Sequence, residues 1–213
     1  DGTQVWLNAG SRIVYNNLRF NSSNREVQLD GEAFFDVAPN SSHPFIIHTS
    51  RASVTVLGTA FNIRAYPGDP QFEASLIRGA IEVHAKGYEK PVRLRPNEKI
   101  VINTPAIVQQ QLQPVKILPL TYVSDPSAST DSLIMENAWV ENRLAFTSKP
   151  FELLAVDMER WYNVKFNFSD EEIKQVKFTG VFSNESLEQA LSALQLTGDF
   201  KFRIVKNEVY IMK

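Results

Sequence analysis

The segment Val54-Thr-Val-Leu-Gly-Thr-Ala-Phe-Asn-Ile63 decides the fold class of the first half of this chain. Apolar and polar residues alternate on both sides of Gly58, which is the pattern of two short strands joined by a bend. Further pairs alternate in the same way on either side of this segment: Val27/Leu29, Ile81/Val83, Val92/Leu94 and Ile100/Ile102. Turn-forming residues separate them, and no helical stripe occurs within residues 1–102. We therefore predict an all-β domain over residues 1–105, built as a sandwich, a jelly roll or a short solenoid.

The next part of the chain, residues 106–138, has a different composition. It contains the polar tract Gln109-Gln-Gln111, several prolines and the flexible stretch Asp125-Pro-Ser-Ala-Ser-Thr-Asp131. Such residues interrupt regular structure and favour extended connections. We predict an inter-domain linker over residues 106–138, with one strand around Val115–Leu120.

From Trp139 onward the apolar period changes to that of a helix. One helical face is formed by Phe151, Leu154, Ala155, Met158 and Trp161. Ser148 is the expected N-cap of this helix, and Pro150 suits its first turn. A second helix is expected over Ser186–Leu196, with Gly198 as its stop.

These two helices belong to an internal repeat. Phe146–Phe168 aligns with Phe182–Ile204, so that Met158 falls on Leu194 and each copy has the order strand, helix, strand. Two packed copies give a small sheet with two helices on it. The sequence therefore predicts an α+β chain, with an all-β domain at 1–105 and a βαβ-repeat module at 139–213.

Composition excludes several classes of function. The 213 residues carry a net charge of −2 and a pI near 6.0, without the clustered Lys and Arg that nucleic acids demand. There is no cysteine, and His43, His48 and His84 lack the spacing of metal ligands. No nucleophile motif, phosphate loop or dinucleotide fingerprint is present. We predict no enzyme activity, no metal, no cofactor and no nucleic-acid partner.

Acidic and aromatic residues are the remaining candidates for a site. Asp30, Glu32 and Asp36 share one face of a strand, and we expect a solvated face because no base, nucleophile or metal ligand accompanies them. Trp6 and Trp139 are interpreted as core residues, with a sugar-stacking surface as the alternative.

The last strand, Glu208-Val-Tyr-Ile-Met212, offers a candidate partner-binding surface. Val209 and Ile211 point one way and Tyr210 and Met212 the other, so helices covering one side would leave one pair outside. The strand ends the chain, and an edge position would allow strand addition by a partner at Tyr210 and Met212. The alternative, which we prefer, is a central strand or one covered by neighbouring segments.

Five motifs in series point to a known family. They are Asp1-Gly-Thr-Gln-Val-Trp-Leu-Asn-Ala9, Gly31-Glu-Ala-Phe-Phe-Asp-Val37, Pro44-Phe-Ile-Ile-His-Thr49, Val54-Thr-Val-Leu-Gly-Thr-Ala-Phe-Asn-Ile63 and Leu76-Ile-Arg-Gly-Ala-Ile-Glu-Val83. In this order they resemble the periplasmic part of FecR-type regulators, which control an extracytoplasmic-function sigma factor. The repeat at 139–213 resembles the STN-type signalling module of secretins and TonB-dependent transporters.

This resemblance implies a periplasmic part of a single-pass inner-membrane anti-sigma factor or sigma regulator. Its expected partners are the signalling domain of an outer-membrane TonB-dependent transporter for iron or glycan uptake and, through a cytoplasmic part outside this sequence, the sigma factor. A carbohydrate-binding or adhesin-like β module of the cell envelope is the alternative.

The resemblance also draws attention to the bond between Gly58 and Thr59. Some relatives are thought to cleave themselves at a Gly-Thr step, where the threonine hydroxyl attacks the preceding carbonyl in an N-to-O acyl shift. We prefer a bend between two strand segments, because no neighbouring residue is visibly placed to drive the shift.

Overall fold

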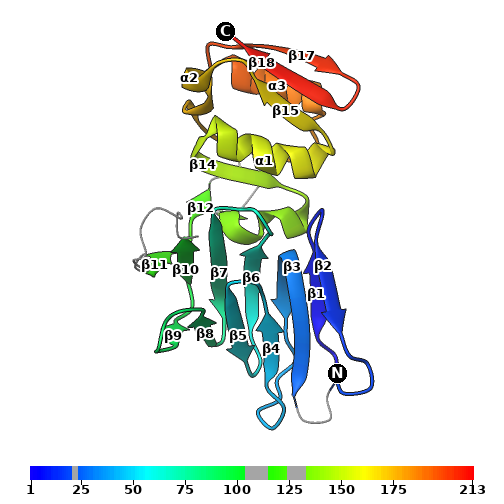
Figure 1. Cartoon of the computed structure of the whole chain (residues 1–213), viewed down its shortest axis with the longest axis vertical. Coiled ribbons are helices and arrows are strands. Elements are labelled where there is room, and N and C mark those ends of the chain that lie inside the picture. The colour runs from blue at the N-terminus through cyan, green and yellow to red at the C-terminus, as the bar shows by residue number, and fades with distance from the viewer. Residues whose placement is uncertain (21–23, 104–114, 124–132) are drawn as a thin grey trace. The chain divides into compact units, whose positions relative to one another are not determined.

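The computed structural model describes residues 1–20, 24–103, 115–123 and 133–213 (Figure 1). The chain divides into two compact units, Asp1–Thr121 and Tyr122–Lys213. The predicted linker at 106–138 falls partly outside the described residues, and its boundaries stay a prediction. Within it, strand β11 (Lys116–Pro119) lies where the sequence predicts one, and β12 (Tyr122–Val123) pairs with β13 (Leu133–Ile134).

The first unit is all-β. Its further strands are β1 (Gln4–Leu7), β2 (Arg12–Tyr15), β3 (Arg25–Asp36), β4 (Phe45–His48), β5 (Ala52–Val56), β6 (Ala60–Ala65), β7 (Gln71–Arg78), β8 (Ile81–Ala85), β9 (Val92–Leu94) and β10 (Glu98–Asn103). They form one curled sheet in the order β11-β10-β7-β6-β3-β4-β5-β8-β9, and β1 and β2 both pair with β3. Every pair is antiparallel except β3 with β4.

Strand β3 serves both halves of this sheet. Its residues before Gly31 pair with β2 and β4, and those from Gly31 onward pair with β6, with β1 alongside. Gly31 has a φ of +118°, and a Cβ atom there would lie 2.4 Å from the Ser11 hydroxyl oxygen. Glycine alone accepts both this backbone conformation and this close approach.

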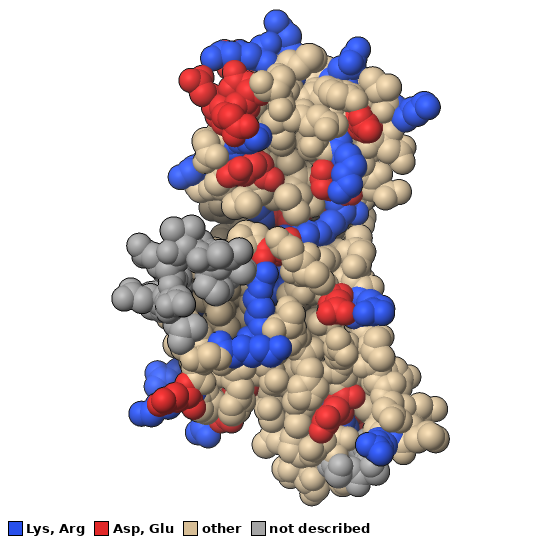
Figure 2. Space-filling model, in the orientation of Figure 1, with Lys and Arg blue, Asp and Glu red and all other residues tan. Residues whose placement is uncertain are grey.

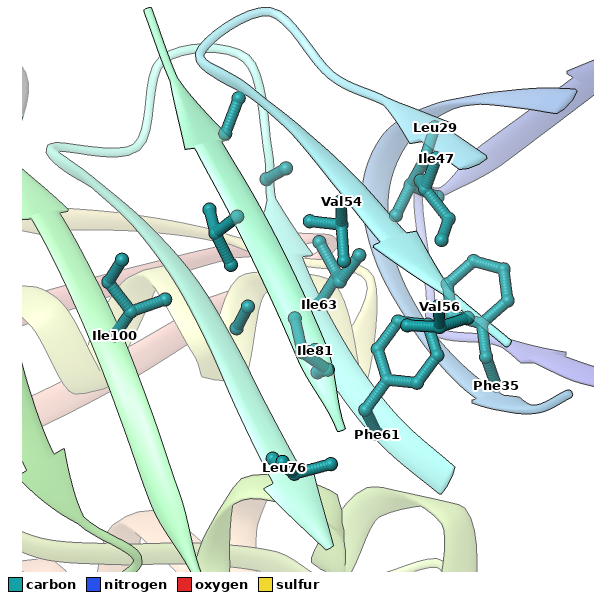
Figure 3. Close-up of a cluster of buried hydrophobic side chains, with 14 of the residues drawn as sticks. Leu29, Phe35, Ile47, Val54, Val56, Phe61, Ile63, Leu76, Ile81 and Ile100 are labelled. Carbon is teal, nitrogen blue, oxygen red and sulfur yellow. The ribbon is translucent and has the colours of Figure 1, made fainter. Parts of the chain in front are cut away.

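The inward side chains of both halves make one core (Figure 3). The alternating pairs named from the sequence are buried, Val92 excepted: it is only partly buried and packs against the core. Phe35 and Phe61 stack with ring centroids 5.1 Å apart. The prediction of an all-β first half is confirmed, and its architecture is a curled sheet whose halves face each other.

The second unit is α+β, as predicted. Its remaining elements are a 3₁₀ helix η1 (Met135–Glu141), β14 (Leu144–Pro150), α1 (Phe151–Tyr162), β15 (Lys165–Phe168), α2 (Glu171–Lys174), β16 (Lys177–Phe182), α3 (Leu187–Gln195), β17 (Lys201–Val205) and β18 (Glu208–Met212). The two repeat copies are β14-α1-β15 and β16-α3-β17. Trp139, interpreted as a core residue, lies in η1 and is only partly buried.

Equivalent strands of the repeat lie in the same sheet. The first strands, β14 and β16, pair with each other, and Phe146 contacts Phe182 at a centroid distance of 5.3 Å. The second strands, β15 and β17, both pair with β18, which lies between them. The module therefore distributes its strands over a two-stranded and a three-stranded sheet around one core.

The helix starts differ from each other. Ser186 caps α3 with a capping box, since its hydroxyl accepts the Gln189 N–H and the Gln189 side chain accepts the Ser186 N–H. Ser148, predicted to cap α1, does not do so: Pro150 occupies the N-cap position without a side-chain cap bond. The reason is that β14 runs on to Pro150 across a bulge, and the Ser148 N–H donates to the Thr179 hydroxyl.

Met158 and Leu194 test the repeat through stability. Their side chains are 0% and 5% exposed at equivalent helix positions. We expect either residue, changed to Ala, to lower the unfolding free energy by about 2–5 kcal/mol through lost contacts and a residual cavity. Leu196→Ala is the matched control, because this nearby leucine is 87% exposed and its loss should change little. Denaturant unfolding measures all three, and equal effects of Leu194→Ala and Leu196→Ala would contradict the assignment.

Tyr162 links the end of α1 to the segment before α3. Its hydroxyl donates to the Glu185 carbonyl oxygen at 3.1 Å. Burial, with a smaller contribution from the Glu185 charge, raises the pKa of Tyr162 to about 12, against about 10 in an unfolded chain. The unfolded chain therefore loses this proton first, and Tyr162 contributes stability below pH 10 that is lost as pH rises from about 10 to about 12.

We expect the native chain to be more stable than Tyr162→Phe at pH 8, and this difference in unfolding free energy to shrink as pH rises to about 11.5. The expected decrease is about 1 kcal/mol, which is discounted for the partial exposure of the ring. Urea unfolding at several pH values measures the difference. Tyr15→Phe is the control, since Tyr15 is 56% exposed. A difference in unfolding free energy between the native chain and Tyr162→Phe that stays constant with pH would contradict the raised pKa of Tyr162.

Candidate functional sites

The Gly58-Thr59 step lies between β5 and β6 and is packed against the segment that follows β3. A Cβ atom on Gly58 would lie 2.7 Å from the Pro39 Cα atom, so close packing explains a glycine here. Backbone hydrogen bonds hold the two segments together, from Val37 N–H to the Thr59 carbonyl at 3.0 Å and from Asn40 N–H to the Leu57 carbonyl at 2.7 Å. An open hollow beside the step is lined by Pro39, Asn40, Ser41, Leu57 and Gly58.

The Thr59 hydroxyl is held in a fixed position. The residue is 1% exposed, and its hydroxyl donates to the Ala80 carbonyl oxygen at 3.0 Å. An acyl shift needs a group that removes the hydroxyl proton as the oxygen attacks the Gly58 carbonyl carbon. A backbone carbonyl is not such a base, and within the described residues no titratable side chain is hydrogen-bonded to this hydroxyl.

We therefore expect the purified chain to retain its full mass, without fragments, after prolonged incubation at neutral pH. Intact-mass spectrometry measures this directly, and Thr59→Ala serves as a chain that cannot undergo the shift. A pair of fragments separating between Gly58 and Thr59, absent from Thr59→Ala, would show that the step is reactive.

The carboxylates of β3 do not share one environment. Asp30 pairs with Arg12 at 3.0 Å and Asp36 with Arg78 at 2.7 Å, both near solvent. Glu32 is 5% exposed and accepts hydrogen bonds from the side-chain amides of Asn8 and Asn62, each at 2.9 Å. The prediction of a solvated face is therefore wrong for Glu32. Its hydrogen bonds join β3 to the β1–β2 turn and to β6, which is a structural role.

Two histidines lie on the solvent-facing side of β4 and β8. His48 contacts the Ser53 hydroxyl at 3.2 Å and Glu26 at 3.5 Å. His84 lies 2.9 Å from Glu82, and hydrogen bonds from Arg93 and then His84 lower the pKa of the Glu82 carboxyl. Among the described residues, these two histidines each lie beside one carboxylate, Glu26 for His48 and Glu82 for His84. Across residues 1–20, 24–103, 115–123 and 133–213, no three His, Asp or Glu side chains are arranged to hold a metal ion.

Trp6 does not belong to the core. It lies on β1, 38% exposed, with its ring 5.6 Å from that of Phe34. Val5 and Leu7 beside it are also exposed, at 37% and 44%. The interpretation of Trp6 as a core residue is wrong, because β1 pairs with β3 at the margin of the sheet and all four of its residues are exposed.

The candidate partner-binding residues lie in the middle of a sheet. Strand β18 pairs with β15 on one side and β17 on the other, so an edge position for Tyr210 and Met212 is wrong and the preferred alternative of a central strand is right. Val209 and Ile211 are buried, whereas Tyr210 and Met212 are half-buried on the opposite face. Strand addition at β18 is thereby excluded, and the side chains of that face are what a partner can reach.

Comparisons with known proteins agree across both units. The family model described as FecR protein matches residues 1–82, and the one described as FecR, C-terminal matches residues 143–211. Two crystal structures of a predicted anti-sigma factor from Parabacteroides distasonis ATCC 8503 are 31% identical in sequence, with TM-scores of 0.81 and 0.80. The similarity covers 100% of this chain and 91% of theirs.

The chain belongs to the FecR family. Its similarity to a predicted anti-sigma factor over the full length places it with sigma-factor regulators. A comparison with curated proteins finds no match. None of the helices in the described part of this FecR-family chain is long and apolar enough to cross a bilayer.

Proposed function

We propose that this chain is the periplasmic sensor part of a single-pass inner-membrane regulator, and that it relays the state of an outer-membrane TonB-dependent transporter to an extracytoplasmic-function sigma factor. It acts by binding the periplasmic signalling domain of the transporter. The sigma factor is bound by a cytoplasmic part outside this sequence.

The observation that carries this proposal is the match of both units to one regulator family, in the same order and over nearly the whole chain. The second unit supports it through its architecture, because a βαβ repeat of this kind resembles the signalling module of the transporters themselves. The chemistry agrees as well: the candidate reactive residues are held in structural roles, so binding is the activity that the surfaces offer.

Such a relay has a thermodynamic requirement. The transporter domain must bind one state of the regulator more tightly than the other, because equal affinity shifts no equilibrium. A tenfold preference corresponds to about 1.4 kcal/mol. The surface that the transporter domain contacts must therefore differ between the two states of the regulator.

Binding of transporter domains to the purified chain tests this proposal. The signalling domains of the TonB-dependent transporters of the same organism are titrated one by one by calorimetry. We expect one of them to bind with a Kd of about 1 μM or tighter, equivalent to about −8 kcal/mol.

Failure of every domain to bind a folded chain would contradict the proposal. Binding of envelope glycans instead, lost in Trp6→Ala, would favour the alternative of a carbohydrate-binding module, since Trp6 is the exposed aromatic of β1.

A further inference from the structure

The three-stranded sheet of the second unit has one face outside its core. The inner face contributes Val209 and Ile211 to the core, with Phe166, Phe168, Phe202 and Ile204 packed around them. The ladder registers place the outer side chains in rows: Asn167 and Arg203 lie beside Tyr210, and Lys201 lies beside Met212. Asn167, Lys201 and Arg203 are exposed, whereas Tyr210 and Met212 are half-buried between them.

This outer face is basic. Strands β15, β17 and β18 carry Lys165, Lys201 and Arg203 but a single carboxylate, Glu208. Lys165 is paired with Glu159 at 3.2 Å, and Glu208 accepts a hydrogen bond from the Tyr210 hydroxyl. Neither Lys201 nor Arg203 forms an ion pair with any residue in the described part of the chain. Two unpaired cations therefore flank Tyr210 and Met212 in a chain whose net charge is −2.

The aromatic centre of this face is held in place. The Arg203 guanidinium carbon lies 5.4 Å from the centroid of the Tyr210 ring, and Glu208 fixes the Tyr210 hydroxyl at the other end. A guanidinium that stacks on a ring through its face still presents N–H groups at its edge for a carboxylate. A side chain that is already ordered loses less conformational entropy when a partner binds. Tyr, Arg and Met are also the residue types enriched in interface cores.

The charge distribution elsewhere in this unit differs from that of the outer face. Figure 2 shows acidic side chains gathered over α2, where Asp170, Glu171 and Glu172 follow one another. Lys174 and Lys213 pair with this acidic segment, at 2.5 Å from Glu171 and 3.1 Å from Glu172. Lys174 and Lys213 are thus already neutralised, whereas Lys201 and Arg203 are available to an incoming negative charge.

We propose that the outer face of β15, β18 and β17 is a docking surface for an acidic segment of a partner protein. Arg203 and Lys201 receive its carboxylates, while Tyr210 and Met212 contact the apolar side chains between them. The proposal deepens the proposed function, on which it rests for the identity of the partner as a transporter signalling domain. Recognition is through the side chains of a sheet face and not through a sheet edge.

Charge reversal with a matched control tests this surface. Lys201 and Lys177 are both exposed lysines that begin a strand, of β17 and of β16, and neither forms an ion pair within the described residues. The probe is the transporter domain that binds the native chain. We expect Lys201→Glu to weaken its affinity at least tenfold, and Lys201→Glu with Arg203→Glu to weaken it further. Lys177→Glu should stay within twofold of the native chain, with all melting curves unchanged.

Salt dependence supplies a second measurement. The native chain should lose affinity for the transporter domain as the salt concentration rises, because salt screens exposed charge pairs. The double variant lacks the two cations, so its affinity should fall less between low and high salt. Equal affinities of the native chain, Lys201→Glu and Lys177→Glu would overturn the surface while leaving the proposed function intact.

If no transporter domain binds the native chain, the proposed function is contradicted but the docking surface is not. A different probe then tests the surface. The isotope-labelled chain is then titrated with a peptide of alternating Glu and Leu, and with its Lys-for-Glu counterpart, and the amide shifts are followed by NMR. Shifts confined to β17 and β18, seen only with the Glu peptide, support the docking surface. Shifts elsewhere, no shifts, or binding to anionic lipid vesicles in place of the peptide overturn it.

Discussion

The bend at Gly31 is the constraint on which the first unit depends. A straight strand of twelve residues would belong to one flat sheet, whereas β3 changes partners at Gly31 and serves both halves of the curled sheet. The Ser11 hydroxyl accepts the Glu32 N–H at 2.8 Å immediately after the bend, which a Cβ atom at Gly31 would prevent. The shared core of Figure 3 follows, because inward side chains of both halves come to face each other only when the sheet curls.

The second unit depends on a comparable centre in Phe151. Its ring lies 5.1 Å from each of Phe168, Phe178 and Phe200, which belong to β15, β16 and the segment before β17. The first residue of α1 therefore joins both copies of the repeat. Edge-on contacts with Phe168 and Phe178 and a tilted contact with Phe200 fix the directions from which the strands arrive. With the inner face so occupied, the outer face of the three-stranded sheet lies outside the core.

The sequence predicts local structure here better than it predicts partners in space. Alternation predicts most strands of the first unit and the helical period predicts α1 and α3, because both patterns depend on neighbours within a few residues. The position of β18 between β15 and β17 depends on long-range pairing, which no local pattern encodes.

The same holds for Glu32, whose burial comes from Asn8 and Asn62 far along the chain. Ser148 does not cap α1 as predicted, because β14 continues through the expected cap position. The sequence indicates Tyr210 and Met212 as candidates for the outer face, whereas Lys201 and Arg203 come to lie beside them only through the pairing of β17 with β18.

The central claim is that this chain receives a signal by protein binding and passes it to a sigma factor. The most direct measurement is a sigma-dependent reporter in cells whose regulator carries either the complete chain or one lacking residues 122–213, with regulator levels matched. The account predicts that the reporter responds to the nutrient of the transporter only when the second unit is present. A reporter that responds equally without residues 122–213 would contradict it.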